Sequence, residues 1–238
     1  MNKNISGASK NYYENNYNKH GLSFQRKYPN EEFCRFMGRT YFHENARNRK
    51  KIRILEVGCG SAGNLKLIVN EGFDSYGIDI SKKSISLLKQ NFKNNKKRPI
   101  LKVADMKKIP FTDSYFDCII DVFSSTHLNA EEGNIFIKEI QRCLKHDGLF
   151  YSYFPSKKSD IFKLKKKIML DKDTIFKLNE KQSAYRINKI PFRFLSSKQY
   201  SNILNKENIE TIYKEEITKT YFFGSEKFVF LSVVGKKY

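Results

Sequence analysis

A glycine-rich loop with an acidic residue one predicted strand later is the feature of this sequence that most directly predicts a bound ligand. The loop, Gly58-Cys59-Gly60-Ser61-Ala62-Gly63, completes a G-x-G-x-x-G pattern directly after the apolar run Arg53–Val57. Glycines allow a ligand close to the backbone, and the free N–H groups at the start of the next helix face it. Asp79 ends the following apolar run, where a carboxylate can accept hydrogen bonds from both hydroxyls of an adenosine ribose. A tight turn that binds nothing is the alternative.

Two further acids distinguish a dinucleotide from S-adenosylmethionine. Glu56 precedes the loop, where its charge would repel a pyrophosphate but can orient loop amides and, through water, an ammonium group. Asp105 follows the third predicted strand, in position to accept a hydrogen bond from an adenine amino group. Met106, beside it, would supply an apolar wall and a backbone N–H for the ring. These residues favour S-adenosylmethionine over NAD.

The elements that must position these residues alternate between strand and helix. Buried strands are predicted at 53–57, 75–79, 100–103, 116–121 and 149–154, with helices between them at 62–70, 82–92 and 135–144. Further elements are a helix at 30–44 capped by Asn30, a helix at 196–205, and a terminal hairpin at 210–221 and 227–235. Alternating strands and helices form βαβ units. The sequence therefore predicts an α/β, Rossmann-like fold with a seven-stranded, mostly parallel sheet, an antiparallel terminal strand, and helices on both faces.

Four segments follow from these patterns. We expect an N-terminal helical cap at 1–45, a cofactor-binding core at 46–156, an insertion at 157–193, and a C-terminal helix and β-hairpin at 194–238 that complete the same domain. The 157–193 stretch is lysine-rich and weakly patterned. Because such sheets bind ligands at the carboxyl ends of their strands, the insertion is expected to lie over those ends and to contribute to the substrate site.

Residues from about 53 to 155 resemble a class I S-adenosylmethionine-dependent methyltransferase. The resemblance rests on EVGCGSAGN (56–64), YGIDIS (76–81), VADMKKIPFTDSYFD (103–117) and CLKHDGLF (143–150). More narrowly, NLKLIVNEGFDSYGIDIS, FDCIIDVFSS, FYSYFPSKKSD and PFRFLS are similar to bacterial methyltransferases suspected of acting on surface saccharides. The family often has its third loop glycine at position 62, whereas this chain has Ala62 and then Gly63.

The resemblance implies cofactor-binding roles for individual positions. These are Glu56, the loop residues Gly58, Cys59, Gly60 and Gly63, the ribose-binding Asp79 with Ile80 beside the adenine, the adenine-binding pair Asp105 and Met106, and Asp121 near the ammonium group. Related enzymes often cover the cofactor with an aromatic N-terminal segment, which implies this role for Tyr13 and Tyr17. A sulfonium beside an aromatic ring gains about 0.5–2 kcal/mol. A segment that merely packs on the sheet is the alternative.

Methyl transfer asks mainly for alignment of donor and acceptor, and a hydroxyl acceptor also needs a base. His127, in FSSTHLN after the fourth strand, is the best candidate, because an ordinary histidine pKa of about 6.5 suits the task. A histidine that only packs or caps a helix is the alternative. Asp121 is the second candidate base. Arg26, Tyr28 and Arg193 are the candidate substrate-binding residues.

The charge balance points to anionic partners. The chain carries 45 Lys and Arg against 25 Asp and Glu, a formal net charge of +20, unless this only reflects a lysine-rich composition. The N-terminus has no apolar signal region, and no apolar run approaches the roughly 18 residues of a membrane span. Four scattered cysteines predict reduced thiols rather than a metal site. We therefore expect a cytoplasmic protein, monomeric or homodimeric, without membrane insertion and without a metal.

These expectations combine into one favoured function and two alternatives. The favoured function is an enzyme that uses S-adenosylmethionine, releases S-adenosylhomocysteine, and methylates a small, phosphate-bearing molecule, namely a hydroxyl of a nucleotide- or lipid-linked sugar of a surface glycan. The first alternative is an RNA methyltransferase that uses the basic surface. However, methyltransferases that act on the amino groups of bases carry an N-P-P-Y type of motif after the fourth strand, whereas this chain reads Asp121-Val122-Phe123-Ser124 there. This difference counts against methylation of adenine in DNA or RNA. The second alternative is a non-catalytic scaffold with the same fold.

Overall fold

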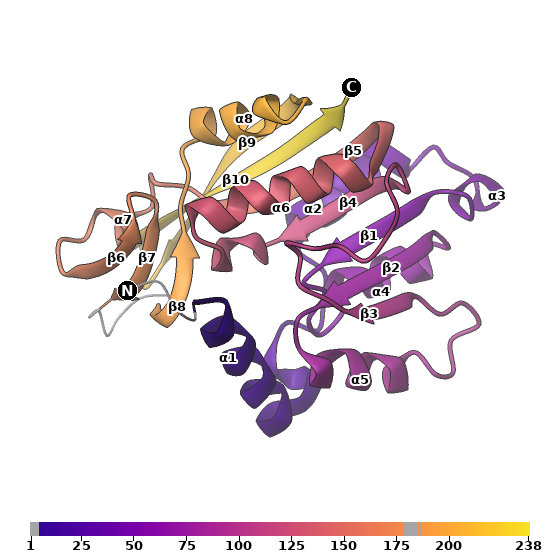
Figure 1. The fold of residues 1–238 in the computed structure, drawn as a ribbon, viewed down its shortest axis with the longest axis horizontal. Helices are drawn as coiled ribbons and strands as arrows, with labels where there is room; N and C mark the ends of the chain where they lie inside the picture. Colours follow the sequence, from indigo (N-terminus) through magenta and orange to yellow (C-terminus); the bar gives the residue numbers. More distant parts are fainter. Residues whose placement is uncertain (1–4, 179–184, 186) are drawn as a thin grey trace.

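One seven-stranded sheet forms the centre of the protein (Figure 1). The computed structural model describes residues 5–178, 185 and 187–238. The strands are β1 (Arg53–Val57), β2 (Asp74–Asp79), β3 (Ile100–Val103), β4 (Phe116–Val122), β5 (Leu144–Pro155), β9 (Ile209–Tyr221) and β10 (Glu226–Lys237). Their order across the sheet is β3-β2-β1-β4-β5-β10-β9. Strands β1 to β5 are parallel, and β10 pairs antiparallel with both β5 and β9, so the predicted fold class is confirmed.

Helices cover both faces of this sheet. On one face lie α2 (Glu31–Tyr41), α4 (Gly63–Asn70) and α5 (Lys82–Asn91), and on the other α6 (Ala130–Cys143) and α8 (Ser197–Lys206). Successive strand side chains point to opposite faces, so each strand contributes to two cores. In β1, Ile54 packs in the core of the first face, whereas Leu55 and Val57 pack in the second. The short helix α3 (Ala46–Arg49) precedes β1.

The 157–193 stretch has a weakly patterned sequence, yet it contains a second, small sheet. After the short helix α7 (Asp160–Lys163), strands β6 (Lys167–Asp171), β7 (Thr174–Leu178) and β8 (Asn188–Arg193) pair antiparallel. Register shifts interrupt both pairings, so the alternation of apolar and polar residues that marks a strand is broken in the sequence. Figure 1 shows this small sheet at one end of the main sheet, close to α1 (Ile5–His20).

Residues 5–30 belong to the segment 1–45 that was predicted as an N-terminal cap, and the name "the cap" is used below for residues 5–30 alone. They are anchored to the core. They comprise α1 and the short 3-10 helix η1 (Gly21–Phe24). Glu14 of α1 accepts hydrogen bonds at the start of α5, at 2.7 Å from the Ser81 hydroxyl and 3.2 Å from the Lys83 backbone N–H. Figure 1 shows α1 between α5 and β8. The cap therefore connects the main sheet to the small sheet.

Helix ends depend on caps, some of which were predicted. Asn30 caps α2 as expected, because its side-chain oxygen accepts from the Phe33 N–H at 3.0 Å. By contrast, α6 begins at Ala130 rather than at 135, because Asn129 and Glu132 form a capping box. The HDG sequence after α6 lies within β5, which starts directly at Leu144.

Candidate active site

A cavity of about 360 Å³ lies where the main sheet, the cap and the small sheet meet. Its size is in the range of small-molecule sites in proteins. Its lining residues are Ser9, Tyr13, Gln25, Arg26, Gly58, Ile78, Asp79, Ile80, Ala104, Asp105, Met106, Lys107, Val122, Phe123, Ser124, His127, Leu128, Tyr185 and Phe192. Eight of the sixteen residues named from the sequence line this cavity, namely Tyr13, Arg26, Gly58, Asp79, Ile80, Asp105, Met106 and His127.

The glycine loop packs around the Asp79 carboxylate at the end of β2. The backbone N–H groups of Gly60 and Ser81 donate to the two carboxylate oxygens, both at 2.9 Å. Burial nevertheless raises the pKa of Asp79 to about 6. Gly58 and Gly60 have φ of +64° and +49°, and a Cβ at Gly58 would lie 2.2 Å from the Ser124 hydroxyl oxygen. A glycine is therefore required at position 58 by both its conformation and its surroundings.

Glu56, at the end of β1, provides a direct test of whether the loop fits S-adenosylmethionine. Its side chain is buried, and its Oε1 accepts from the Asn64 amide at 2.8 Å. Within the described residues its Oε2 is buried without a hydrogen-bond partner. Burial raises the pKa of this carboxyl to about 8. A buried acceptor without a donor fits a ligand that brings one, such as the ammonium group of the cofactor's amino-acid part.

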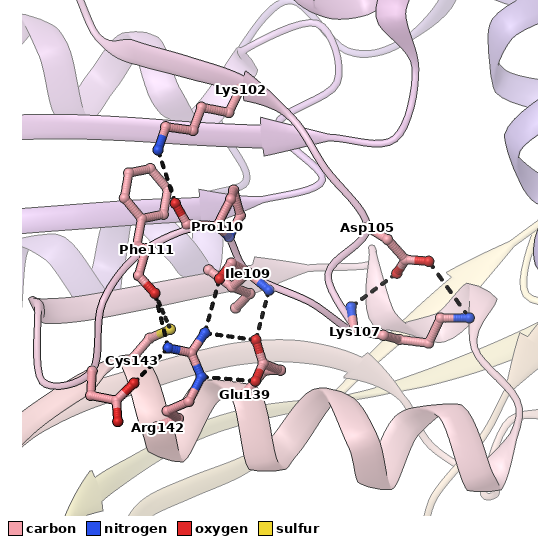
Figure 2. Close-up of polar contacts among 10 residues, drawn as sticks. Lys102, Asp105, Lys107, Ile109, Pro110, Phe111, Glu139, Arg142 and Cys143 are labelled. Carbon is pink, nitrogen blue, oxygen red and sulfur yellow. Dashed lines mark hydrogen bonds and ion pairs between the residues drawn. The ribbon is translucent and has the colours of Figure 1, made fainter.

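Asp105 and Met106 line the other end of the cavity, on the loop after β3. Figure 2 shows the Asp105 carboxylate held by Lys107, whose backbone N–H donates at 2.9 Å and whose ammonium lies 3.6 Å away. The same ammonium forms an ion pair of 2.6 Å with Glu132 at the start of α6. The loop is thereby fixed to α6 while Asp105 remains at the cavity wall, as an adenine-binding acid requires.

An ion-pair network that sequence reasoning missed holds the rest of this loop (Figure 2). The guanidinium of Arg142 on α6 makes two hydrogen bonds to Glu139, at 2.9 and 2.8 Å. It also donates to the carbonyl oxygens of Ile109 and Phe111 and to the Asp113 carboxylate. These bonds raise the pKa of Arg142 and lower that of Glu139. Glu139 and Arg142 form a local i,i+3 pair on α6, but no local spacing indicates the contacts of Arg142 with Ile109, Phe111 and Asp113.

His127 faces the cavity in a defined tautomer. It belongs to the short 3-10 helix η2 (Ser125–His127), which follows β4. Its Nδ1 lies 2.9 Å from the carbonyl oxygen of Pro191 in β8, and a carbonyl only accepts, so Nδ1 carries the proton. Its Nε2 therefore carries no proton, and it accepts a hydrogen bond from the Tyr13 hydroxyl at 2.6 Å. Burial lowers the pKa of His127, which keeps the ring neutral near pH 7.

Asp121, predicted as a cofactor ligand and second base, has no free access to the cavity. Its carboxylate is completely buried at the end of β4 and accepts from the backbone N–H groups of Ser124 and Ser125, both at 3.0 Å. The Ser125 hydroxyl also donates to it, as does the Ser152 hydroxyl at 3.3 Å. Four donors saturate the carboxylate. This carboxylate shapes the turn that carries His127 and, with its four donors, is poorly placed to act as a base. The implied backbone contact of Asp121 with the ammonium group of the cofactor stays a prediction.

Tyr17 and two loop residues pack the cap against the core instead of lining the cavity. The Tyr17 ring is fully buried, and its hydroxyl donates at 2.8 Å to Gln25. A Cβ on Gly60 would lie 2.1 Å from the same Gln25 oxygen, and one on Gly63 would lie 2.8 Å from the Tyr28 carbonyl oxygen. These glycines therefore allow the cap to approach closely. Gln25, which lines the cavity, was not predicted.

Three further predicted residues lie outside the cavity wall. Cys59 is buried, and the side chain of Tyr28 is 73% exposed, so it points to solvent. Arg193 is buried against α6, where a Cβ on Gly133 would lie 1.8 Å from its Nη1. Alternation along β8 explains this position, because Phe192 faces the cavity and Arg193 the other side. The predictions of Tyr28 and Arg193 as substrate residues are therefore corrected.

An aromatic wall that sequence reasoning missed lines part of the cavity. Phe123 follows β4 with φ of +67°, and its ring stacks on Tyr185 at 5.8 Å between centroids. Phe192 of β8 completes the wall, 5.9 Å from the His127 ring. Among the described residues, no three His, Cys, Asp or Glu side chains are grouped to hold a metal ion.

Comparisons with known proteins agree with this fold. Residues 55–152 match the model of a family described as a methyltransferase domain. The crystal structure of 1,6-didemethyltoxoflavin-N1-methyltransferase from Burkholderia thailandensis, with bound 1,6-didemethyltoxoflavin and S-adenosylhomocysteine, superposes with a TM-score of 0.68. It is 10% identical and covers 98% of this chain and 88% of that one. Residues 55–152 thus form a class I methyltransferase domain, and S-adenosylmethionine is its cofactor.

Two curated relatives are similar over less than half of this chain. The chain is 32% identical over 102 residues to ubiquinone biosynthesis O-methyltransferase of Pelagibacter ubique, over 43% of this chain and 41% of the relative. It is 31% identical over 109 residues to the putative 23S rRNA (guanine-N(1)-)-methyltransferase YxjB of Bacillus subtilis, over 43% of this chain and 33% of that protein. The chain thus spans less than half the length of these relatives, and their names differ in acceptor.

Proposed function

We propose that the protein transfers the methyl group of S-adenosylmethionine to a hydroxyl of a small molecule, with His127 as the base. One observation carries this proposal: a neutral imidazole whose Nε2 is directed toward the Tyr13 hydroxyl in the cavity wall, while its Nδ1 is fixed by a backbone carbonyl. A neutral histidine at this position is suited to accept the proton of a hydroxyl acceptor. An amine acceptor would need no such base.

The residues at the glycine-loop end hold the cofactor in this proposal. Asp79 accepts from the ribose hydroxyls, Asp105 from the adenine amino group, and Glu56 from the ammonium group. When bound, S-adenosylmethionine supplies an electrophilic methyl group. The support is that both Asp79 and Asp105 line the cavity, while Glu56 has a buried oxygen without a donor in the described chain.

Tyr13 takes part in proton transfer. Its hydroxyl donates to His127 Nε2, and burial raises its pKa, so it stays protonated. As the acceptor oxygen loses its proton to Tyr13, Tyr13 passes its own proton to Nε2, which leaves an imidazolium and a neutral phenol. Tyr13 was expected to cover the cofactor; we assign it to the acceptor side.

The acceptor class that we favour is a sugar of a nucleotide- or lipid-linked glycan. Aromatic faces such as those of Phe123 and Phe192 suit stacking against a ring. Arg26 also lines the cavity and, in the described part of the chain, forms no ion pair within hydrogen-bond distance, although its charge acts on the buried Glu56. We assign it to a phosphate of the acceptor. The narrower identity of the sugar is part of the proposal.

The decisive experiment combines binding with turnover. Calorimetry should show binding of S-adenosylmethionine and S-adenosylhomocysteine but not of NAD. Transfer of a labelled methyl group should then be screened over nucleotide sugars, lipid-linked sugars, their amino analogues and total RNA. Labelled sugar with a new methyl ether supports the proposal, whereas labelled amines or RNA refute it.

RNA is the second candidate acceptor, because the net charge is +20 and one relative is named for ribosomal RNA. This function predicts RNA binding whose affinity falls steeply with salt. A non-catalytic scaffold predicts no cofactor binding and no labelled product from any acceptor.

A further inference from the structure

The hairpin between β9 and β10 ends in two exposed phenylalanines. Its tip reads Phe222-Phe223-Gly224-Ser225. Phe222 is 51% exposed, and the Phe223 side chain is fully exposed. Phenylalanine is normally found inside proteins, so two adjacent exposed rings at the end of a long hairpin need an explanation.

The backbone of the tip holds these rings outward. Phe222, Phe223 and Gly224 have φ of 51°, 56° and 86°. Left-handed backbone is unfavourable for bulky residues and is kept at sites where the surrounding structure imposes it. Here the Gly224 N–H donates to the Tyr221 carbonyl oxygen at 3.1 Å, and the Ser225 hydroxyl donates to that of Phe222 at 2.8 Å. The exposure of the rings is thus built into the turn.

One lysine follows the tip in β10, and a lysine-rich segment is joined to the hairpin by a hydrogen bond. The Lys227 backbone N–H donates to Asp160 of α7 at 2.8 Å, which ties the hairpin to the lysine-rich segment 163–167. Lys165 and Lys166 in that segment are exposed and, among the described residues, form no ion pair. We call Phe222, Phe223, Lys165, Lys166 and Lys227 the hairpin surface.

The hairpin surface lies on the side of the cavity's acceptor end. Tyr185, which lines the cavity, lies 6.2 Å from Tyr221 and 4.3 Å from Phe228, measured between ring centroids. Tyr221 directly precedes the two exposed phenylalanines. Aromatic ring contacts therefore connect the cavity wall to Tyr221, the residue directly before the tip.

We propose that the hairpin surface docks the protein on an anionic lipid bilayer. Phenylalanine rings enter the interface between headgroups and acyl chains, and lysines at the same level attract anionic headgroups. Among the described helices none is long and apolar enough to cross a membrane, so the contact is peripheral. The site proposed above would then open toward a surface that holds amphipathic acceptors.

Charge decides between this partner and a second copy of the chain. A symmetric contact through the tip would bring the same lysines together, whereas an anionic bilayer neutralises them. RNA would also neutralise the lysines, and its bases can stack on phenylalanine rings, but such rings line a basic groove that follows the strand. Here the two rings protrude at the end of a hairpin, which suits insertion into a bilayer interface better than a groove for RNA.

The test is sedimentation of the full chain with vesicles of phosphatidylcholine alone and of phosphatidylcholine with phosphatidylglycerol. We expect binding to the mixed vesicles, about tenfold weaker or worse for Phe222→Asn/Phe223→Asn and for Lys165→Gln/Lys166→Gln. Asparagine tolerates the left-handed backbone, so the turn is retained. The matched control is Phe42→Asn, because Phe42 is 84% exposed at the end of α2; this variant should bind as wild type does.

Three results would overturn the proposal. They are a wild-type chain that binds neither kind of vesicle, a tip variant that binds as well as wild type, and an equal loss in Phe42→Asn. Sedimentation velocity and RNA binding without vesicles identify the other partners. If the tip substitutions leave vesicle binding unchanged but dissociate a dimer, the surface binds a second copy of the chain. If they leave vesicle binding unchanged but lower RNA affinity, the surface binds RNA. Vesicle binding is independent of turnover, so its failure is distinct from failure of the proposed reaction.

Discussion

His127 is held from two sides by segments far from it in the sequence. Pro191 of the small sheet fixes Nδ1, and Tyr13 of the cap occupies Nε2. A change of this side chain should therefore affect proton transfer more than cofactor binding.

We predict that His127→Ala lowers kcat/KM by about 10²–10⁴-fold, the usual contribution of a general base. Affinity for S-adenosylmethionine, measured by calorimetry, should change by less than about twofold, because the proposed cofactor contacts lie elsewhere. His146→Ala is the control, because this histidine has a 75% exposed side chain and pairs only with Asp147 in the described structure. Less than a tenfold loss in His127→Ala would remove it as the base.

Glu56 should make the stability of the ligand-free protein depend on pH. Burial raises the pKa of this carboxyl from 4.5 to about 8 in the folded protein. Between these values the folded state binds more protons than the unfolded state, so the free energy of unfolding falls as the pH rises. The stabilisation is complete below the unfolded pKa and is lost as the pH passes the folded one.

We predict that Glu56→Gln removes part of this dependence, because the amide cannot ionise. Thermal unfolding followed at several pH values should give similar Tm for variant and wild type near pH 5 and a higher Tm for the variant above pH 8. A difference of about 1 kcal/mol would appear as about 2–4 °C in a protein of this size. Parallel curves over the whole range would show that Glu56 ionises as freely in the fold as in the unfolded chain.

One acidic side chain of the cap, Glu14, joins α1 to the start of α5. Glu14 accepts from the Ser81 hydroxyl and the Lys83 N–H, where the helix presents free donors. The same cap carries Tyr13 and Gln25 into the cavity wall. Attachment of α1 and completion of the cavity are thus linked.

We predict that Glu14→Gln weakens S-adenosylmethionine binding about fivefold or more, which corresponds to a lost interaction of about 1 kcal/mol. Hydrogen exchange should rise in α1 and at the start of α5 but not in α6. The matched control is Glu31→Gln, because Glu31 lies 3.5 Å from Lys219 with a 73% exposed side chain. Equal effects of both substitutions would mean that removal of a negative charge, rather than of the Glu14 contact, weakens S-adenosylmethionine binding.

The elements that carry the cofactor end were predictable, whereas those of the acceptor end were not. Strands β1 and β2, the glycine loop, and Asp79 and Asp105 follow local patterns that are periodic or closely spaced. The small sheet has broken register, and its role depends on which face of β8 meets the cavity. Phe192 and Arg193 are adjacent, and only the structure shows that the aromatic residue, not the cation, faces the site.

At the scale of the molecule, 45 basic residues against 25 acidic ones attract anions over long distances. This net charge does not determine the geometry of the site. The cavity itself has a mixed lining in which Lys107 is neutralised by Asp105 and Glu132. Cofactor binding and surface binding should therefore respond differently to salt.

We predict that the dissociation constant for S-adenosylmethionine changes less than about twofold between about 50 and 300 mM salt, because buried contacts are little screened. Vesicle binding should fall several-fold over the same range. Calorimetry and sedimentation measure the two quantities. A cofactor affinity that follows salt as steeply as vesicle binding would mean that surface charge, rather than the cavity, governs it.

The carbonyl of Pro191 has a consequence for how this protein can change over evolution or in the laboratory. The inserted segment that shapes the acceptor end also orients the imidazole that is to activate the acceptor. Exchange of that segment for one with another specificity would alter reactivity at the same time. Acceptor specificity and reaction rate are therefore expected to change together when this segment changes. A replacement segment that keeps β8 should preserve the rate better than one that also replaces β8.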